Sequence, residues 1–114
     1  MLFAGTAVGD FDAAVAWYTA VFGRAADVPV AEGEVMWRIT DSAFLYLVRE
    51  PGRAGGGLLT LSVADLDLAV AEVAARGIDG APIEQVGAAG RRVVYADPDG
   101  NRLALVEVAQ SPED

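Results

Sequence analysis

The chain has 114 residues, 54% of them hydrophobic and 22% charged, with a formal net charge of −9. This length and composition predict one globular domain, and the excess of acid argues against nucleic-acid binding, which needs clustered positive charge. The absence of Cys and His excludes disulfides, thiolate metal sites and the commonest general base. No apolar run is long enough to cross a membrane and no secretory leader is visible, so we expect a cytoplasmic protein without a membrane partner.

Two segments of the chain follow the same pattern. Residues 3–8 read as a short strand that leads into an apolar helical periodicity over residues 11–22, and residues 58–63 lead in the same way into residues 66–76. Each predicted helix follows an acid suited to the N-cap and is followed by a glycine suited to the left-handed C-terminal position. These residues are Asp10 and Gly23 in the first half, and Asp65 and Gly77 in the second.

Three strand signals follow each helix and complete the repeat. They cover residues 27–31, 34–40 and 43–49 in the first half, and residues 81–86, 91–96 and 102–109 in the second. The last two strands of each half are joined by turn-forming residues, Asp41-Ser42 and Asp97-Pro98-Asp99-Gly100-Asn101. We therefore predict one α+β domain over residues 1–114, with module one at 1–50, a flexible glycine-rich linker at 51–57, module two at 58–110 and a tail at 111–114.

Two stretches of this sequence resemble a known family. Residues 8–10 with 16–23 (Val-Gly-Asp, then Ala-Trp-Tyr-Thr-Ala-Val-Phe-Gly) are similar to the first helix of the vicinal oxygen chelate superfamily, which includes glyoxalase I, bleomycin-resistance proteins and extradiol dioxygenases. Residues 95–105 resemble its closing turn and strand. The resemblance implies two βαβββ modules in pseudo-twofold arrangement, forming a cup-shaped eight-stranded mixed sheet with outer helices. It also implies a homodimer, in which the cup forms within one chain or across a domain swap.

The resemblance also implies four positions for metal ligands in the enzymes of this family. On this chain they fall on Phe3, Tyr46, Leu58 and Ala104. A divalent metal needs several convergent nitrogen or oxygen ligands, and Tyr46 alone is a weak candidate. We therefore predict no metal, no other cofactor and no catalytic residue, as in the metal-free, bleomycin-resistance-like branch of the family.

Strand alternation, together with the resemblance, predicts which side chains face the cup. Aromatic residues there suit stacking on a flat ring, and arginines suit a ligand carboxylate or phosphate, although sheet-edge pairing of these arginines with Glu34 or Glu84 is an open alternative. Trp37 alternates away from this face, and Asp97 with Asp99 are expected to be solvated. The predicted ligand-binding residues are Phe3, Met36, Arg38, Phe44, Tyr46, Leu58, Thr60, Arg92, Val94 and Ala104.

These features favour metal-independent binding of a hydrophobic or aromatic small molecule, with sequestration of a natural product or antibiotic as one form of that function. Two alternatives stay open from sequence. One is a glyoxalase-type lyase or isomerase with a non-standard site, and the other is a non-catalytic structural member of the family.

Overall fold

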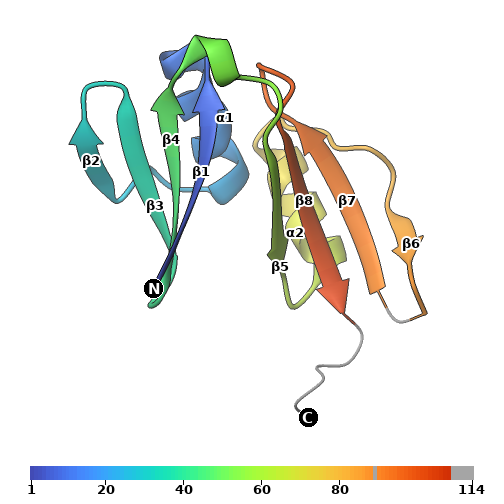
Figure 1. The fold of residues 1–114 in the computed structure, drawn as a ribbon. Helices are drawn as coiled ribbons and strands as arrows, with labels where there is room; N and C mark the ends of the chain where they lie inside the picture. Colours follow the sequence, from blue (N-terminus) through green and yellow to red (C-terminus); the bar gives the residue numbers. More distant parts are fainter. Residues whose placement is uncertain (89, 109–114) are drawn as a thin grey trace.

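A computed structural model describes residues 1–88 and 90–108. The elements repeat the order β-α-β-β-β twice (Figure 1), which confirms the α+β class and the two modules. Residue 89, Ala109, which ends the last predicted strand, and the predicted tail lie outside the described residues. The elements are β1 (Leu2–Val8), α1 (Phe11–Phe22), β2 (Val28–Ala31), β3 (Glu34–Thr40), β4 (Ala43–Arg49), the short 3-10 helix η1 (Pro51–Arg53), β5 (Leu58–Ser62), α2 (Leu66–Ala75), β6 (Glu84–Val86), β7 (Gly90–Ala96) and β8 (Arg102–Val108).

The eight strands form two four-stranded sheets, in the orders β1-β4-β3-β2 and β5-β8-β7-β6. In each sheet the first strand runs parallel to the last strand of its module, and the remaining pairs are antiparallel. A parallel neighbour requires a crossover connection, and in each module the connection to the remaining strands begins with the helix. The strands that we predicted in one mixed sheet are therefore arranged as two mixed sheets, one for each module.

The helices begin and end where the capping residues predict. The Asp10 carboxylate accepts a hydrogen bond from the Ala13 N–H at 3.1 Å, and Asp65 accepts one from Leu68 N–H at 3.0 Å. Gly23 closes α1 with φ of 75°, a value that favours glycine. These caps fix the direction in which each helix leaves its first strand.

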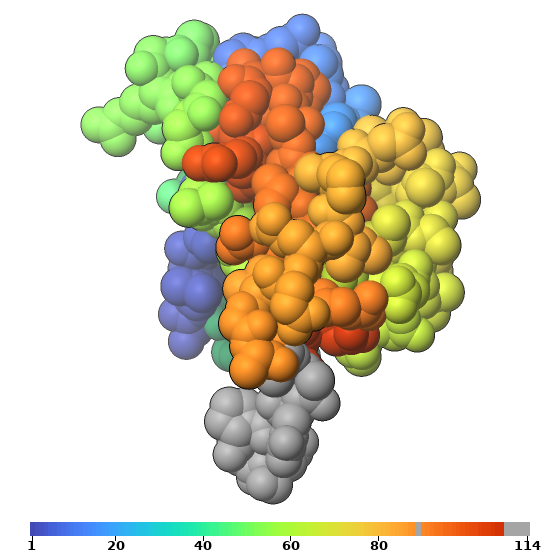
Figure 2. Space-filling model, turned by 90° about the vertical axis from the view of Figure 1, so that its right-hand side faces the viewer, coloured from blue at the N-terminus to red at the C-terminus, as the bar shows by residue number. Residues whose placement is uncertain are grey.

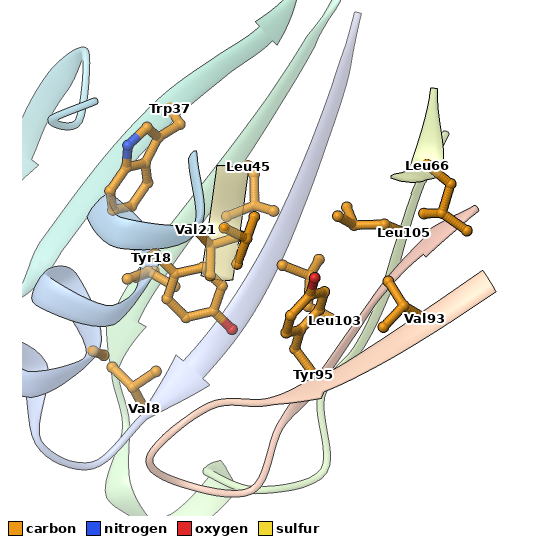
Figure 3. Packing of buried hydrophobic residues seen from close by; sticks show 13 residues of the cluster. Val8, Tyr18, Val21, Trp37, Leu45, Leu66, Val93, Tyr95, Leu103 and Leu105 are labelled. Carbon is orange, nitrogen blue, oxygen red and sulfur yellow. The ribbon is translucent and has the colours of Figure 1, made fainter. Parts of the chain in front are cut away.

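The helix-facing sides of the two sheets face each other across one shared core. One buried cluster contains Trp37 and Leu45 of the first sheet, Leu103 of the second and Tyr18 of α1. Figure 3 shows Tyr18 and Leu45 on one side of this cluster and Leu103 beside Tyr95 on the other. All five side chains are almost fully buried. Both helices therefore lie on the inner side of the molecule, where the resemblance implied outer helices, and the other faces of the two sheets point away from the shared core (Figure 1). We call these the outer faces.

The closing turn of the second module is buried against the first module. The Asp97 side chain is 5% exposed, and one of its oxygens accepts hydrogen bonds from the backbone N–H groups of Asp99 and Asn101, both at 2.9 Å. The other oxygen accepts from the Tyr18 hydroxyl and the Asn101 amide, also at 2.9 Å. Our expectation of a solvated Asp97 was wrong, because its partner Tyr18 is brought to it from 79 residues away.

Asn101 extends this network to the linker and to β1. Its amide nitrogen donates to the Ala7 carbonyl at 2.9 Å, and its oxygen accepts from Gly55 N–H at 3.0 Å and Gly57 N–H at 2.7 Å. Figure 2 shows the linker lying beside this turn. The linker that we predicted as flexible thus has defined contacts, and these contacts help to fix one module against the other.

Candidate functional site

The outer face of the first sheet is apolar and largely aromatic. Leu45 and Leu47 of β4 are buried against the core, so the residues alternating with them point outward. In the sheet register Phe3 lies beside Phe44, and their rings stack at 5.6 Å with an interplanar angle of 18°. Met36 lies opposite Tyr46 on the neighbouring strand. We call the four outward side chains Phe3, Met36, Phe44 and Tyr46 the aromatic floor.

The Tyr46 ring lies across β1 above Gly5. The two residues are register partners in adjacent strands, and a Cβ atom added to Gly5 would overlap Cζ and Cε2 of the ring. Adjacent strands are about 4.8 Å apart, so a ring standing upright from β4 would hold its tip well away from Gly5. The tyrosine therefore leans along the sheet surface, and the missing side chain of Gly5 provides the space.

The outer face of the second sheet carries smaller groups. Ala104 lies beside Thr60 in the register and opposite Val94, and Leu58 is 68% exposed at the start of β5. Ala104 occupies the position that Tyr46 occupies in the first module. The two outer faces therefore differ in volume at equivalent positions.

Each candidate arginine is paired with an acid of its own module. Arg38 contacts Asp41 at 2.9 Å, and Arg92 contacts Glu84. The Glu84 pairing is the sheet-edge alternative left open from sequence, whereas Arg38 takes Asp41 in place of Glu34. All four side chains are exposed, so each pair contributes little stability. An anionic ligand would have to compete with these carboxylates.

The four positions implied as metal ligands do not fit a divalent ion. Phe3, Leu58 and Ala104 carry hydrocarbon side chains, and only Tyr46 has an oxygen. In residues 1–88 and 90–108, no three His, Cys, Asp or Glu side chains gather closely enough to hold a metal. The donor chemistry of this face thus differs from that of a metal centre.

A cleft of about 260 Å³ lies between the two modules, away from the outer faces. Its walls come from both helices and from the helix-facing sides of both sheets, and they include Phe22, Ile39 and Leu61. Arg76, the residue that caps the end of α2, lines this cleft and donates to the backbone carbonyls of Ala20 and Val21 in the last turn of α1. This cleft is part of the contact between modules and contains none of the ten predicted residues.

The structure places the ten predicted residues on the two outer faces, five on each sheet. The residues predicted on β3 share a face with those predicted on β4, because Met36 is the register partner of Tyr46 and Arg38 is that of Phe44. The pairing of the two strands becomes irregular only after Arg38. Within one chain, however, the two sets are not brought together, because the outer faces point apart. Gly5 was missed as a site residue, although a glycine inside a strand is a signal of close approach by another group. The first set is Phe3, Met36, Arg38, Phe44 and Tyr46, and the second is Leu58, Thr60, Arg92, Val94 and Ala104.

Two buried side chains, Trp37 and Tyr18, lie in the core beneath the outer faces and are not part of the candidate site. Trp37, predicted to face the helix, is fully buried and donates its indole N–H to the Arg24 carbonyl at 3.0 Å. Burial and the adjacent Asp97 carboxylate raise the pKa of Tyr18, so its hydroxyl remains a hydrogen-bond donor between the modules. Both groups belong to the core that holds the outer faces in place.

The chain is thus an α+β protein built from two βαβββ modules. Each module has one mixed sheet with one face turned away from the core. Residues 3–105 match the Glyoxalase/Bleomycin resistance protein/Dioxygenase superfamily, and the chain belongs to this family. No curated protein gives a match. No helix in the described part of the chain is long and apolar enough to span a membrane.

Solved structures with the same fold include relatives of several kinds. A glyoxalase/bleomycin resistance protein from Catenulispora acidiphila is 40% identical, with 93% of this chain and 96% of that chain covered and a TM-score of 0.88. TnmS3, described as an antibiotic-binding protein from a Streptomyces species, is 24% identical over 93% of both chains, with a TM-score of 0.74. A lactoylglutathione lyase from Agrobacterium tumefaciens is 22% identical over 94% of this chain and 92% of that chain, with a TM-score of 0.77. The last two likenesses concern the fold alone.

Proposed function

We propose that this protein binds a hydrophobic, aromatic small molecule on the aromatic floor, without a metal ion. The observation that carries the proposal is the position of the aromatic side chains. Trp37, Tyr18 and Tyr95 are buried in the core, whereas Phe3 is 55% exposed and stacks on Phe44 on an outer face. Apolar surface gains free energy when a ligand removes it from water, by about 25 cal/mol per Å², and clustered exposed apolar groups are typical of binding surfaces.

The proposal includes a homodimer in which two copies complete each binding site. A small-molecule site surrounds most of its ligand, but one outer face supplies only one wall. Bulky residues on the first sheet and small residues on the second are complementary in volume. The aromatic floor of one copy would face Thr60 and Ala104 of its partner, which corresponds to the domain-swapped form of the dimer.

The chemistry of the ligand-binding face argues against the enzyme alternative. The standard metal site of a glyoxalase-type lyase or isomerase would need ligands at the four equivalent positions, and three of these side chains have no donor atom. The enzyme alternative therefore requires a non-standard site. The antibiotic-binding relative supports a natural product as the kind of ligand, with sequestration as the physiological role. It does so by fold alone, so the ligand itself is part of the proposal.

The proposal is tested by equilibrium dialysis of the aromatic dye 1-anilinonaphthalene-8-sulfonate in the presence of EDTA. We expect saturable binding that EDTA does not weaken, and Phe3→Ala should weaken it. Leu68→Ala is the matched control, because Leu68 lies on α2, away from the floor, and is 56% exposed. Equal losses in the two variants, or binding that disappears with EDTA and returns with zinc, would contradict the proposal.

The proposed dimer is tested separately, by sedimentation velocity of the purified chain at micromolar concentration. We expect the mass of two chains. A monomer at concentrations well above those that saturate the dye would remove the second wall from the proposed site.

A further inference from the structure

Gly5 points to a narrower ligand class than a generally hydrophobic one. We propose that Gly5 is a specificity-determining residue that makes the aromatic floor selective for planar rings, by allowing Tyr46 to lie along the sheet. This inference rests on the proposed function, since it concerns the same face. It adds a residue with no side chain of its own to the determinants of ligand choice.

The geometry of the Gly5–Tyr46 pair supports the first step. The ring tip of Tyr46 occupies the space directly above Gly5, and any Cβ there would overlap Cζ and Cε2. With alanine at this position the ring would have to rise from the sheet. A ring that stands up from the sheet would expose its edge to a ligand. A ring that leans along the sheet exposes its face.

A second pair of rings lies beside Tyr46 on the same two strands. Phe3 and Phe44 lie two residues before Gly5 and Tyr46, respectively, on the same face. Their interplanar angle of 18° makes them nearly parallel. The two rings stack on each other and form one rigid apolar block beside the Tyr46 ring. A flat ligand can lie against the leaning Tyr46 ring and gain from offset stacking beyond simple area burial, whereas a compact, rounded ligand touches that ring at fewer atoms.

The second module has no glycine–tyrosine pair at the equivalent place. Thr60 stands at the position of Gly5, and Ala104 stands at the position of Tyr46. Neither of these two side chains has a ring that could lean across β5. In the proposed dimer this wall would lie opposite the floor, and its small side chains leave the space that a flat ring system needs.

The test compares two cationic probes of different shape, 9-aminoacridine, which is planar, and 1-aminoadamantane, which is compact and rounded. Both are attracted alike by a chain of net charge −9, so a difference between them reports shape. Isothermal titration calorimetry should give a wild-type affinity for the planar probe at least tenfold above that for the rounded one. Gly5→Ala should lower the affinity for 9-aminoacridine about tenfold and leave that for 1-aminoadamantane unchanged.

Gly56→Ala is the matched glycine control, because nothing lies within 4 Å of a Cβ added at Gly56. It should leave both affinities at the wild-type value. Tyr46→Phe keeps the ring and should bind 9-aminoacridine as wild type does, whereas Tyr46→Leu should lose about tenfold. In the double variant Gly5→Ala/Tyr46→Leu the losses should not add, since without the ring there is nothing for the methyl group to displace.

The outcomes separate this inference from the proposed function. If wild type binds the planar and rounded probes equally, or if Gly5→Ala binds 9-aminoacridine as wild type does, the inference is overturned and aromatic binding as such stands. If wild type binds neither probe nor the anilinonaphthalene dye, the proposed function falls and the inference falls with it. If Gly5→Ala fails to fold, the Tyr46→Leu and Tyr46→Phe pair decides the matter, since loss in both variants or in neither would overturn the inference.

Discussion

The two sheets of this chain are alike on one side and different on the other. On the helix-facing side, Leu45 and Leu47 of β4 correspond to Leu103 and Leu105 of β8, and all four are buried. On the outer side, Tyr46 corresponds to Ala104. The repeat therefore specifies the core twice with nearly the same residues, whereas the outer faces are free to differ, and the chemistry that could define a function lies where they differ.

The closing turns of the two modules show a second difference. The Asp41 side chain is fully exposed and pairs with Arg38, while Asp97 is buried under Tyr18 and Asn101. Among the described residues, the second turn forms hydrogen bonds with Tyr18 and Ala7 of the other module, whereas the side chains of the first turn bond within their own module. The second turn thus helps to hold the modules together, and the first serves its own sheet.

The largest expected effect on stability concerns the leucines that the two modules bury at equivalent positions of the shared core. Leu45→Ala and Leu103→Ala should each lower the free energy of unfolding by about 3 kcal/mol, because each leaves a cavity at a fully buried site. Leu58→Ala, on an outer face, should cost less than about 0.5 kcal/mol. Urea unfolding followed by circular dichroism measures all three. A loss at one leucine more than twice that at the other would show that the two modules do not share the core equally.

The next effect tests the difference between the turns. Asp97→Ala should lower the free energy of unfolding by about 2 kcal/mol, since it leaves the Tyr18 hydroxyl and buried amide groups without an acceptor. Asp41→Ala should cost almost nothing, because its pair with Arg38 is exposed to solvent. Thermal unfolding of the two variants provides the comparison. Equal losses would mean that the Asp97 network does not hold the modules together.

The smallest effect concerns pH. Arg91 and the Leu66 N–H hold the pKa of Glu107 below its ordinary value of 4.5, so this carboxylate stabilises the fold above about pH 4.5 and the contribution is lost as the pH falls further. Glu107→Gln should therefore flatten the fall of stability below pH 4.5. Arg49, at the equivalent position of the first module, is the control, and Arg49→Gln should leave that limb of the profile as in wild type. Urea midpoints from pH 3 to 7 measure both, and an unchanged slope in Glu107→Gln would contradict the assignment.

Much of the fold could be predicted from local sequence. Helix limits followed from Asp10, Asp65 and the glycines after each helix, because caps act within a few residues. Strands β3 and β4 were predicted with their observed bounds, as alternation is a local signal. The strand predicted over 81–86 was too long at its start and begins at Glu84. Pro82 has no N–H to contribute to a ladder, which is consistent with that later start.

The features that sequence did not predict all depend on distant partners. Asp97 resembles an ordinary turn acid until Tyr18 is brought to it from the other module. The role of Gly5 depends on where one tyrosine ring on a neighbouring strand comes to rest. The separation into two sheets with a shared inner core likewise depends on how the modules pack, which the alternation within each strand does not encode.

In the proposed dimer each site forms between the aromatic floor of one copy and a wall of small residues, Thr60 and Ala104, of the other. This arrangement is tested by mixing two variants, Tyr46→Ala, which damages the floor, and Thr60→Trp, which blocks the wall, and by measuring the number of 9-aminoacridine sites after dissociation and reassociation. At a probe concentration near the wild-type Kd, each variant alone should show little binding, because removing the Tyr46 ring weakens binding and Thr60→Trp fills the wall. Random reassociation makes about half of the dimers mixed, each with one intact site, so the mixture should recover about a quarter of the wild-type sites. No recovery from a mixture shown to contain mixed dimers would place both walls in one chain and contradict the account.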